Sequence, residues 1–340
     1  MIKLNTLLIL IILSTTSFAQ PNKWNKKKHF TVVSYNVENL FDTIDTPHKN
    51  DTEFTPLSTK KWNNERYLKK IDALSFVLSE INKNELPELI GLVEVENETG
   101  VKDLASSAKL KEGNYSYIIE DGPDPRGIDC ALLYRAEIFK YLMHKSIQVR
   151  FPFANNQRTR DILYVKGLVK KDTIHVFINH WSSRRGGMEK SEPKRLQSAQ
   201  NLKAVTDSIL LVNAKANIII MGDFNDEPNN KSMHETLQAG TPAESLAFTN
   251  LVYENFSKGE GTYYYKKNFN MLDHLILNNA FINKKKGFRP IMPEAYIFKP
   301  DTICYTNKNG DKSPGKTYGG KNYYGGFSDH FPIYTYFYQK

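Results

Sequence analysis

The sequence has little cysteine and, beyond its first residues, no long hydrophobic run. Two cysteines in 340 residues exclude a disulfide scaffold and any zinc module built on four cysteines. No later apolar stretch approaches the ~20 residues of a membrane-spanning helix. The apolar surroundings of Cys130 favour a buried thiol, while a disulfide between Cys130 and Cys304 stays open. With 40% hydrophobic residues, the chain has too much apolar material to stay disordered.

The charge balance of the chain is basic. It has 46 lysine and arginine residues against 37 aspartate and glutamate residues, a net charge of +9. This excess of positive charge would attract an anionic partner. Solubility alone is an equally good explanation, so the charge permits a polyanionic partner without requiring one.

Residues 1–19 have the features of a secretory signal peptide. Lys3 gives a positive start, 7–13 is an unbroken apolar run, and Ser17-Phe18-Ala19 places small residues at the cleavage site. No cysteine follows that site, so a lipid anchor is not supported. We therefore expect a secreted or periplasmic protein whose mature chain, residues 20–340, is a single domain without a transmembrane helix.

The mature chain mixes strand and helix patterns, with no break in composition that would mark a linker. Two amphipathic patterns predict helices at 61–81 and 193–211, the second with Pro193 in its first turn. About ten strands with few crossover helices favour an α/β (α+β) fold of two packed sheets over one doubly wound parallel sheet. The predicted strands are 30–37, 89–95, 115–120, 128–134, 138–149, 162–169, 174–180, 217–221, 262–265, 272–277 and 331–338.

Acidic, amide and histidine side chains fall at the ends of these apolar strands. Charged groups are almost never fully buried unless they are paired or bind a metal. The set therefore suggests a shared rim on which the side chains converge around a cation. Taken singly, each has a structural alternative, such as turn formation by Asp223 and Asn225. The residues are Asn36, Glu38, Glu94, Asp129, His180, Asp223, Asn225, Asp273, His274, Asp329 and His330.

The segments that carry these residues resemble the endonuclease/exonuclease/phosphatase superfamily. Gly-Asp-Phe-Asn at 222–225 together with Ser-Asp-His-Phe-Pro at 328–332 is the specific combination. The resemblance covers essentially the whole mature chain. It implies a DNase I-like four-layer αββα sandwich of two mostly antiparallel or mixed sheets flanked by helices, with a divalent-metal phosphodiesterase site at one end. The other matching segments are 34–38, 92–96, 178–183 and 272–275.

The resemblance also implies a set of metal ligands. Phosphate ester cleavage needs charge neutralisation on the phosphoryl oxygens, an activated in-line water and a protonated leaving group. Glu94 is the expected main ligand of Mg²⁺, with Mn²⁺ or Ca²⁺ as alternatives. Glu38 and Asp329 are the expected auxiliary ligands. Family members often carry aspartate at the position of Glu38, so the reach of its longer side chain stays open.

The expected acid–base groups follow from the same motifs. His330 would contact the phosphate or act as base, with Asp273 orienting and charging its imidazole. Asp223 would take the proton of the nucleophile or supply that of the leaving group. Asn225 would orient the phosphate, and Asn36 would hold a neighbouring carboxylate or a phosphoryl oxygen.

A second histidine and three arginines complete the predicted site. His180 resembles the histidine of the DNase I-like branch that donates to the scissile phosphate. We expect Asp129 to be its partner, although a turn residue at the strand start is an equal alternative. Arg160 opens the predicted strand at 162–169, and Arg184 and Arg185 follow His180 in a loop beside the site. The guanidinium groups of these arginines suit phosphate.

These features predict a secreted, Mg²⁺-dependent nuclease-like phosphodiesterase that acts on DNA or RNA as a monomer, without a protein partner. One alternative is a phospholipid or sphingomyelin phosphodiesterase, or a phosphatase. The aromatic and basic stretch 301–327 would then contact a membrane. Another alternative is a non-catalytic module that binds polyanions.

Overall fold

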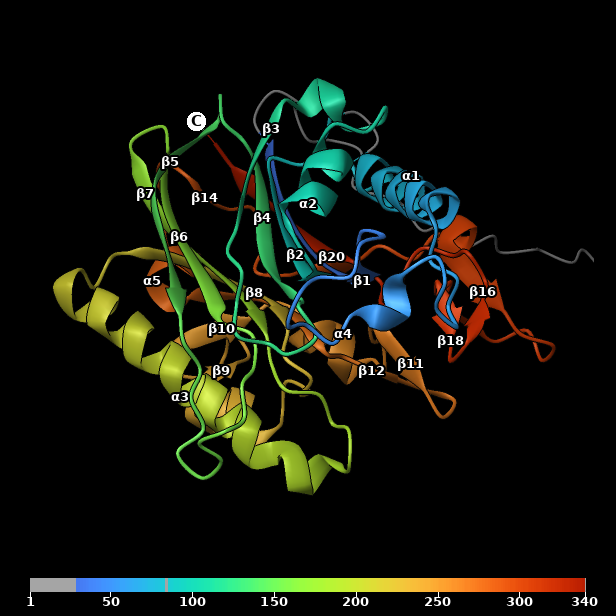
Figure 1. Ribbon diagram of the computed structural model, residues 1–340. Coiled ribbons are helices and arrows are strands. Elements are labelled where there is room, and N and C mark those ends of the chain that lie inside the picture. Colours follow the sequence, from blue (N-terminus) through green and yellow to red (C-terminus); the bar gives the residue numbers. More distant parts are fainter. Residues whose placement is uncertain (1–28, 83–84, 340) are drawn as a thin grey trace, which may run out of the picture.

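Figure 1 shows the computed structural model, which describes residues 29–82 and 85–339. The predicted signal peptide lies outside these residues. In the part that is described, no helix is both long enough and apolar enough to cross a membrane. Cys130 and Cys304 are both free thiols.

Two large mixed sheets form the centre of the molecule. One has the strand order β14-β20-β1-β2-β4-β3, with β15 also paired to β20. Its strands are β1 (His29–Leu40), β2 (Leu89–Val95), β3 (Tyr115–Ile119), β4 (Asp129–Arg135), β14 (Arg289–Pro290), β15 (Tyr296–Ile297) and β20 (Ile333–Tyr338).

The second sheet has the order β5-β6-β7-β8-β13-β10-β9. Its strands are β5 (Phe139–Ile147), β6 (Ile162–Val169), β7 (Asp172–His180), β8 (Asn217–Asp223), β9 (Ala239–Gly240), β10 (Phe248–Asn250) and β13 (Asp273–Asn278). Three small hairpins lie outside the two sheets. They are β11 (Tyr263–Tyr265) with β12 (Asn268–Asn270), β16 (Cys304–Thr306) with β17 (Lys312–Pro314), and β18 (Tyr318–Gly319) with β19 (Asn322–Tyr323).

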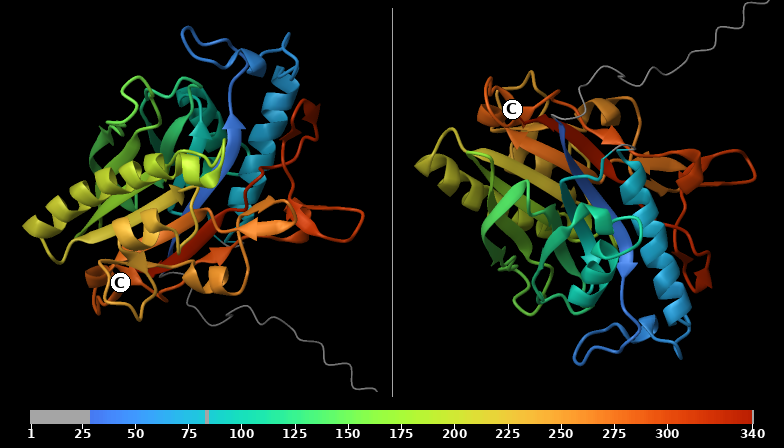
Figure 2. Two further views of the ribbon diagram at one scale, coloured as in Figure 1. Left: turned by 90° about the horizontal axis from the view of Figure 1, so that it is seen from below. Right: turned by 90° about the horizontal axis from the view of Figure 1, so that it is seen from above.

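Helices cover both outer faces of the sandwich. Helices α1 (Asn64–Glu80) and α2 (Glu98–Ala105) pack on the first sheet, and α3 (Met188–Val212) packs on the second (Figures 1 and 2). Two short helices, α4 (Tyr253–Ser257) and α5 (Asn279–Ile282), follow β10 and β13. The four-layer αββα arrangement predicted from the sequence is therefore confirmed.

The alternation of apolar residues along β1 explains the layers. Phe30 and Val32 belong to the core between the sheets, whereas Val33 and Tyr35 face the α1 and α2 side. Successive side chains of a strand point to opposite faces, so one apolar strand serves two cores. All three hydrophobic clusters of the structure are built in this way around the two sheets.

The predicted strands and both long helices are present, with one boundary clearly wrong. Helix α3 begins at Met188, after Gly187 in a left-handed conformation (φ 117°), so Pro193 lies inside the helix and not in its first turn. Proline in this position removes one backbone donor. The helix tolerates the loss of this one hydrogen bond, so it begins before the proline and not at it.

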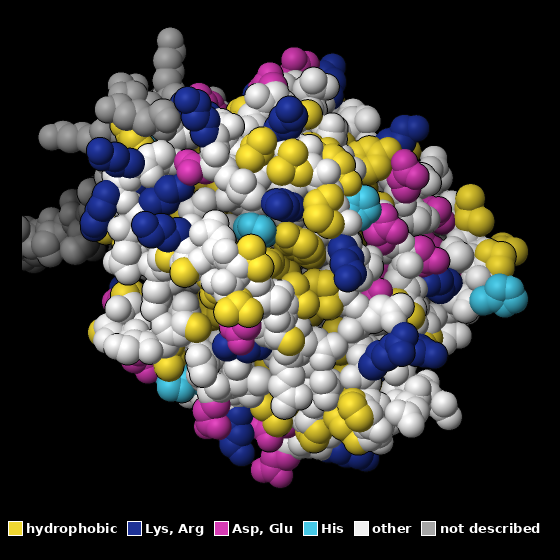
Figure 3. Space-filling view, turned by 90° about the vertical axis from the view of Figure 1, so that its left-hand side faces the viewer, with side chains coloured by type: hydrophobic (Ala, Val, Ile, Leu, Met, Phe, Trp, Pro, Cys, Tyr) yellow, Lys and Arg dark blue, Asp and Glu magenta, His cyan; other side chains and the backbone are white. Residues whose placement is uncertain are grey.

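Strand β5 forms an exposed edge of the second sheet. Tyr141, Leu142 and Met143 are all partly exposed there, next to a register shift between Tyr141 and Met143. A bulge of this kind protects an edge strand from pairing with another chain. Figure 3 views the molecule from this side and shows hydrophobic side chains interspersed with scattered basic ones, not a single basic patch.

Candidate active site

Two parallel strand pairs bring the predicted residues to one end of the sandwich. Strand β1 is parallel to β2, and β7 is parallel to β8. The carboxyl ends of parallel neighbours lie at the same edge of a sheet. Strand β13 is antiparallel to β8 and pairs Asp273 with Asp223, so its first residue joins the same edge.

Bulges at the ends of β1 and β2 set the orientation of two carboxylates, those of Glu38 and Glu94. The β1–β2 register shifts between Asn36 and Leu40, and the β2–β4 register shifts between Val93 and Val95. Glu38 (φ 50°) and Glu94 (φ 67°), which lie at these shifts, have left-handed backbones. Non-glycine residues in that conformation often mark functional sites. The bulge turns Glu94 out of the regular alternation that its strand neighbours follow.

A chain of short separations links the acids and imidazoles at this end. Nε2 of His180 lies 3.7 Å from Oε1 of Glu94 and 3.8 Å from Oδ2 of Asp223. The same Oδ2 atom lies 3.8 Å from Nε2 of His330. Residues that are far apart in the sequence therefore meet at one place, as the motifs predicted.

His330 is held as a charged imidazole. Its Nδ1 forms a 2.7 Å hydrogen bond with Oδ2 of Asp273, which also accepts a hydrogen bond from the Thr262 hydroxyl. Burial opposes the charge, but the carboxylates of Asp273 and Asp223 outweigh it and raise the pKa of His330 well above its usual value. The ring of Tyr263 packs on the imidazole with centroids 4.8 Å apart.

The imidazole of His180 is, in contrast to that of His330, held in its uncharged form. Burial, together with the positive charges of Arg160 and Arg126, lowers its pKa well below the usual value, so this imidazole is neutral. Its Nδ1 has no hydrogen-bond partner among the described residues. The predicted pairing with Asp129 is therefore wrong, because the Asp129 carboxylate instead accepts a hydrogen bond from the backbone N–H of Gly122.

Asp223 is fixed from both sides. Its Oδ2 accepts a hydrogen bond from Nδ2 of Asn36 (3.1 Å), and its Oδ1 accepts one from the backbone N–H of Asn225 (2.8 Å). Burial raises the pKa of Asp223, and neighbouring carboxylates add to the rise. Gly222, at φ 132°, leads into this residue, and a Cβ there would lie 1.9 Å from the carbonyl oxygen of Asn179. Only glycine fits at that position.

Glu38 anchors the C-terminal loop. Its two carboxylate oxygens accept hydrogen bonds from the backbone N–H groups of Thr317 (2.6 Å) and Tyr318 (3.0 Å). Its direct contacts in the structure are thus with the protein backbone. Its predicted role as an auxiliary metal ligand stays a prediction.

Lys70 is a residue of this site that the sequence reasoning missed. It lies on α1, is 1% exposed, and donates hydrogen bonds to the Thr317 hydroxyl (2.7 Å) and the Phe327 carbonyl (2.6 Å). It therefore ties together the two ends of the loop that leads into Ser328. That serine accepts a hydrogen bond from the backbone N–H of His330 and donates one to the Asn36 carbonyl. The sequence signal that could have revealed it is a lysine on the apolar face of an otherwise amphipathic helix.

The carboxylates suit a hard divalent cation. Burial raises the pKa of Asp329 to about 7, and the charges of Glu38 and Glu94 add to the rise. Oε1 of Glu94 and both oxygens of Asp329 accept no hydrogen bond from the described part of the chain. No three histidine, cysteine or acidic side chains there form a ready-made metal cage. One or two carboxylates completed by water and phosphate are, however, the usual Mg²⁺ arrangement.

The structure corrects the predicted role of Arg160. Its side chain is buried and donates hydrogen bonds to the carbonyl oxygens of His180 and Trp181 and to Oδ2 of Asp124 (2.9 Å). It supports the end of β7 from within the protein, so it does not present a free guanidinium to a phosphate.

Arg184 also binds the protein. Its Nε donates to the Asn225 carbonyl (2.7 Å), and its Nη2 donates to Asn230 (2.8 Å). It therefore holds the backbone of Asn225, which is itself left-handed (φ 50°). Arg185 is exposed, and its predicted contact with phosphate stays a prediction. His274 lies behind the site, buried between Asn250 and the Asp226 carbonyl.

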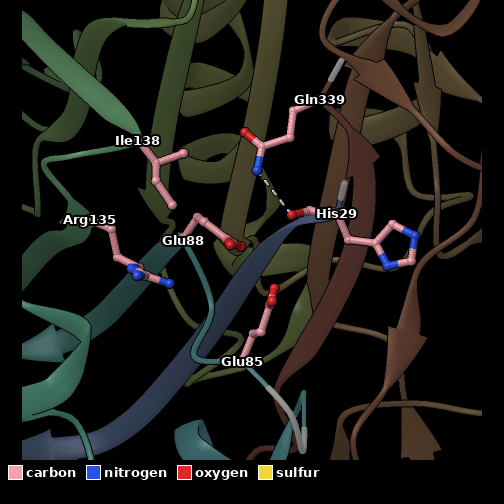
Figure 4. Close-up of a pocket in the computed structure, with 6 residues that line it drawn as sticks. All are labelled: His29, Glu85, Glu88, Arg135, Ile138 and Gln339. Atoms are coloured by element: carbon pink, nitrogen blue, oxygen red, sulfur yellow. Dashed lines mark hydrogen bonds between the residues drawn. The ribbon is translucent and has the colours of Figure 1, made fainter. Parts of the chain in front are cut away.

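A cavity lies elsewhere in the structure. Its volume is about 470 Å³, and Figure 4 shows its lining residues. They include His29, Glu88 and Arg135, which lie at the ends of β1, β2 and β4 that are opposite to the acid–imidazole cluster. Glu88 is buried in its wall and accepts a hydrogen bond from the backbone N–H of Thr31 (2.6 Å). This cavity therefore does not coincide with the acid–imidazole cluster.

The fold and the site together define a class, the phosphoric ester hydrolases. The chain belongs to the Endonuclease/Exonuclease/phosphatase family, whose sequence model matches residues 31–339. The resemblance stated from the motifs is thereby confirmed. No curated protein matches the sequence.

Several solved structures have a similar fold. TDP2 from D. rerio, complexed with a single-strand DNA product, is 17% identical with a TM-score of 0.53, over 91% of this chain and 98% of that one. A family protein from Bacteroides thetaiotaomicron is 14% identical with a TM-score of 0.54, over 92% of this chain and 98% of that one. The human Nocturnin catalytic domain, with bound sulfate, is 16% identical with a TM-score of 0.52, over 92% and 95%. At these identities the likeness establishes the fold alone.

Proposed function

We propose that the protein is an exported, divalent-cation-dependent phosphodiesterase that hydrolyses nucleic acid by in-line attack of water on a phosphate. The observation that carries this proposal is the position of Asp223. Its Oδ2 atom lies 3.8 Å from Nε2 of both His180 and His330. An acid between a neutral and a charged imidazole can exchange a proton while both imidazoles face the same phosphoryl group.

The charge states of the side chains suit distinct roles. His330, kept positive by Asp273, would bind a phosphoryl oxygen and stabilise the charge that develops there. His180 is neutral and would donate a hydrogen bond from Nε2 to another phosphoryl oxygen. Asp223 would move the proton of the attacking water or of the leaving group, because a carboxyl with a raised pKa is suited to proton transfer near neutral pH.

Glu94 and Asp329 would hold the cation, and Glu38 would support them through the loop that it anchors. When bound, a divalent cation such as Mg²⁺ supplies positive charge to the phosphoryl oxygens and orients the ester. Mn²⁺ and Ca²⁺ are alternatives. The unbonded oxygens of Glu94 and Asp329 support this assignment.

A polyanionic substrate fits the charge of the chain. The net charge is +9, and phosphate contacts dominate the affinity of proteins for nucleic acids. The structurally similar D. rerio TDP2 binds a single-strand DNA product, and we extend that class of ligand to this chain as part of the proposal. The proposal also includes export of the protein and a monomeric state.

The test is hydrolysis of four substrates by the purified protein. Single-stranded DNA, plasmid DNA, RNA and sphingomyelin vesicles are incubated with Mg²⁺, Mn²⁺ or Ca²⁺, and with EDTA. We expect cleavage of nucleic acid with a divalent cation and none with EDTA. Cleavage of sphingomyelin alone would favour the lipid phosphodiesterase. Binding of nucleic acid without any hydrolysis would favour the non-catalytic module.

A further inference from the structure

Arg126 is a basic residue beside the site that the proposed function does not use. It lies in the loop between β3 and β4, and its side chain is 47% exposed. Its backbone N–H donates to Oδ1 of Asp124 (2.9 Å), and its Nε lies 3.4 Å from the same oxygen. The left-handed Gly127 that follows donates its N–H to the Asp124 carbonyl. The base of the Arg126 side chain is thus fixed.

The same aspartate connects Arg126 to the catalytic end of β7. Oδ2 of Asp124 accepts a hydrogen bond from Arg160, and Arg160 donates to the His180 carbonyl (3.1 Å). Asp124 is buried, and the two guanidinium groups share its single negative charge. Among the described residues, Asp124 is the only carboxylate that forms an ion pair with either guanidinium group.

Of these two arginines, only Arg126 has donor atoms that are available to a ligand. The donors of Arg160 are directed into the protein. In contrast, neither Nη atom of Arg126 has a hydrogen-bond partner within the residues that the structure describes. An exposed guanidinium with a free fork is the group that binds phosphate oxygens in pairs.

The strand order shows on which side of the site this charge lies. Arg126 leads into β4, which is separated by β2 from β1 and β20. Arg160 leads into β6, which is separated by β7 from β8 and β13. In both sheets the arginines thus lie on the side of Glu94 and His180 that faces away from Asp273 and His330. A phosphate at Arg126 would sit beside the scissile phosphate and not in its place.

We propose that Arg126 binds a phosphate that flanks the scissile ester, so that the site takes a chain of phosphodiesters. This inference rests on the proposed function and deepens it. It predicts that a single-stranded oligonucleotide uses a contact that a diester with one phosphate cannot reach.

The test compares two substrates and three variants. Arg126→Ala and Arg126→Lys are matched by Lys140→Ala, which removes an exposed basic residue at the start of β5, at the other end of the second sheet from His180. The substrates are a single-stranded oligonucleotide and bis(p-nitrophenyl) phosphate, which has one phosphate. Because a charge-assisted contact is lost, we expect Arg126→Ala to lower kcat/KM for the oligonucleotide about 10- to 100-fold, chiefly through KM.

The other expected results follow from the same contact. For bis(p-nitrophenyl) phosphate, Arg126→Ala should have kcat/KM within about 2-fold of the wild-type value. Arg126→Lys should recover part of the loss on the oligonucleotide, and Lys140→Ala should leave the hydrolysis of both substrates unaffected. The slope of log affinity against log salt for the oligonucleotide should fall by about 1 in Arg126→Ala.

Two outcomes would overturn the inference. An equal loss on both substrates would assign Arg126 to the scissile phosphate or to the support of His180. No loss on either substrate would leave no phosphate contact at Arg126. If the wild-type protein cleaves neither substrate, the proposed function fails. Fluorescence anisotropy of the labelled oligonucleotide still decides the inference, which requires weaker binding by Arg126→Ala than by Lys140→Ala.

Discussion

Oδ2 of Asp223 lies 3.8 Å from Nε2 of His330. This separation is too long for a direct hydrogen bond, and one oxygen atom can bridge it. A phosphoryl oxygen or a water molecule placed there would contact the acid and the charged imidazole together. The spacing of this buried pair therefore suits a contact that both side chains share with the substrate.

We predict that Asp223→Asn loses activity while gaining stability. Loss of a group that transfers protons should lower kcat by about 10²- to 10⁴-fold. The amide keeps an oxygen acceptor for Asn225, yet it carries no charge. Because the folded protein raises the pKa of Asp223, ionisation at pH 8 opposes folding, and its removal should raise Tm in EDTA.

The control for this variant is Asp207→Asn, which changes an exposed aspartate that pairs with Lys203 on α3. It should leave both kcat and Tm nearly unchanged. An Asp223→Asn protein with full activity would remove Asp223 from the mechanism.

Lys70→Met should release the C-terminal loop that Glu38 also anchors. Methionine has a similar length but cannot donate hydrogen bonds to Thr317 and Phe327. We expect faster amide hydrogen exchange across 317–327 and a loss of hydrolysis of at least about 10-fold, because positioning errors weaken catalysis strongly. Lys102→Met, on exposed α2 surface, is the matched control. Unchanged exchange in the loop would contradict the assigned role of Lys70.

Glu88→Gln should stabilise the protein in a pH-dependent way. Burial raises the pKa of Glu88 from 4.5 to about 7, so the folded state holds its proton more tightly than the unfolded state. The penalty for ionising this group is absent below pH 4.5, grows as the pH rises to about 7, and is constant above that. The free energy of unfolding of the variant should therefore exceed that of the wild type by up to about 3 kcal/mol at pH 8.

Denaturant unfolding at pH 4.5 and pH 8 checks this difference. Glu112→Gln, at an exposed glutamate, serves as the control and should show no pH-dependent gain. A gain for Glu88→Gln of the same size at both pH values would disagree with a raised pKa.

Arg195→Met should be more destabilising than the double variant Arg195→Met/Asp226→Asn. Nε of Arg195 lies 2.7 Å from Oδ1 of Asp226, and both side chains are buried. Breaking a buried pair by removing one partner costs up to about 3–5 kcal/mol, and here the buried carboxylate of Asp226 would keep only Arg184, at 3.5 Å, as an ionic partner. The double variant removes that charge as well and should recover part of the loss in denaturant unfolding. If the double variant is the less stable of the two, this explanation fails.

The sequence predicted the strands and the meeting of their ends for a definite reason. Periodicity of apolar residues specifies which segments are strands, and a polar residue such as His180 or Asp223 at the end of an apolar run is conspicuous. Motif spacing then placed these residues in one site. The Asp273–His330 hydrogen bond, expected from the motifs, is present.

The partners of the arginines could not be predicted in the same way. A loop arginine such as Arg160 can point to solvent or into the protein, and its nearest acceptor, Asp124, comes from a different sheet connection. The pairing of Asp129 with His180 failed for the same reason, since it depended on a loop path that local sequence does not encode. Lys70 was missed because lysines on helices are usually solvated.

The antiparallel pairing of β1 with β20 has a consequence for biosynthesis. The first strand of the described chain finds this neighbour only when the last strand has been made, and His330 lies just before that strand. A nascent chain on the ribosome therefore lacks the assembled acid–imidazole cluster. We therefore expect the cell that makes this hydrolase to be exposed to its chemistry only after synthesis is complete.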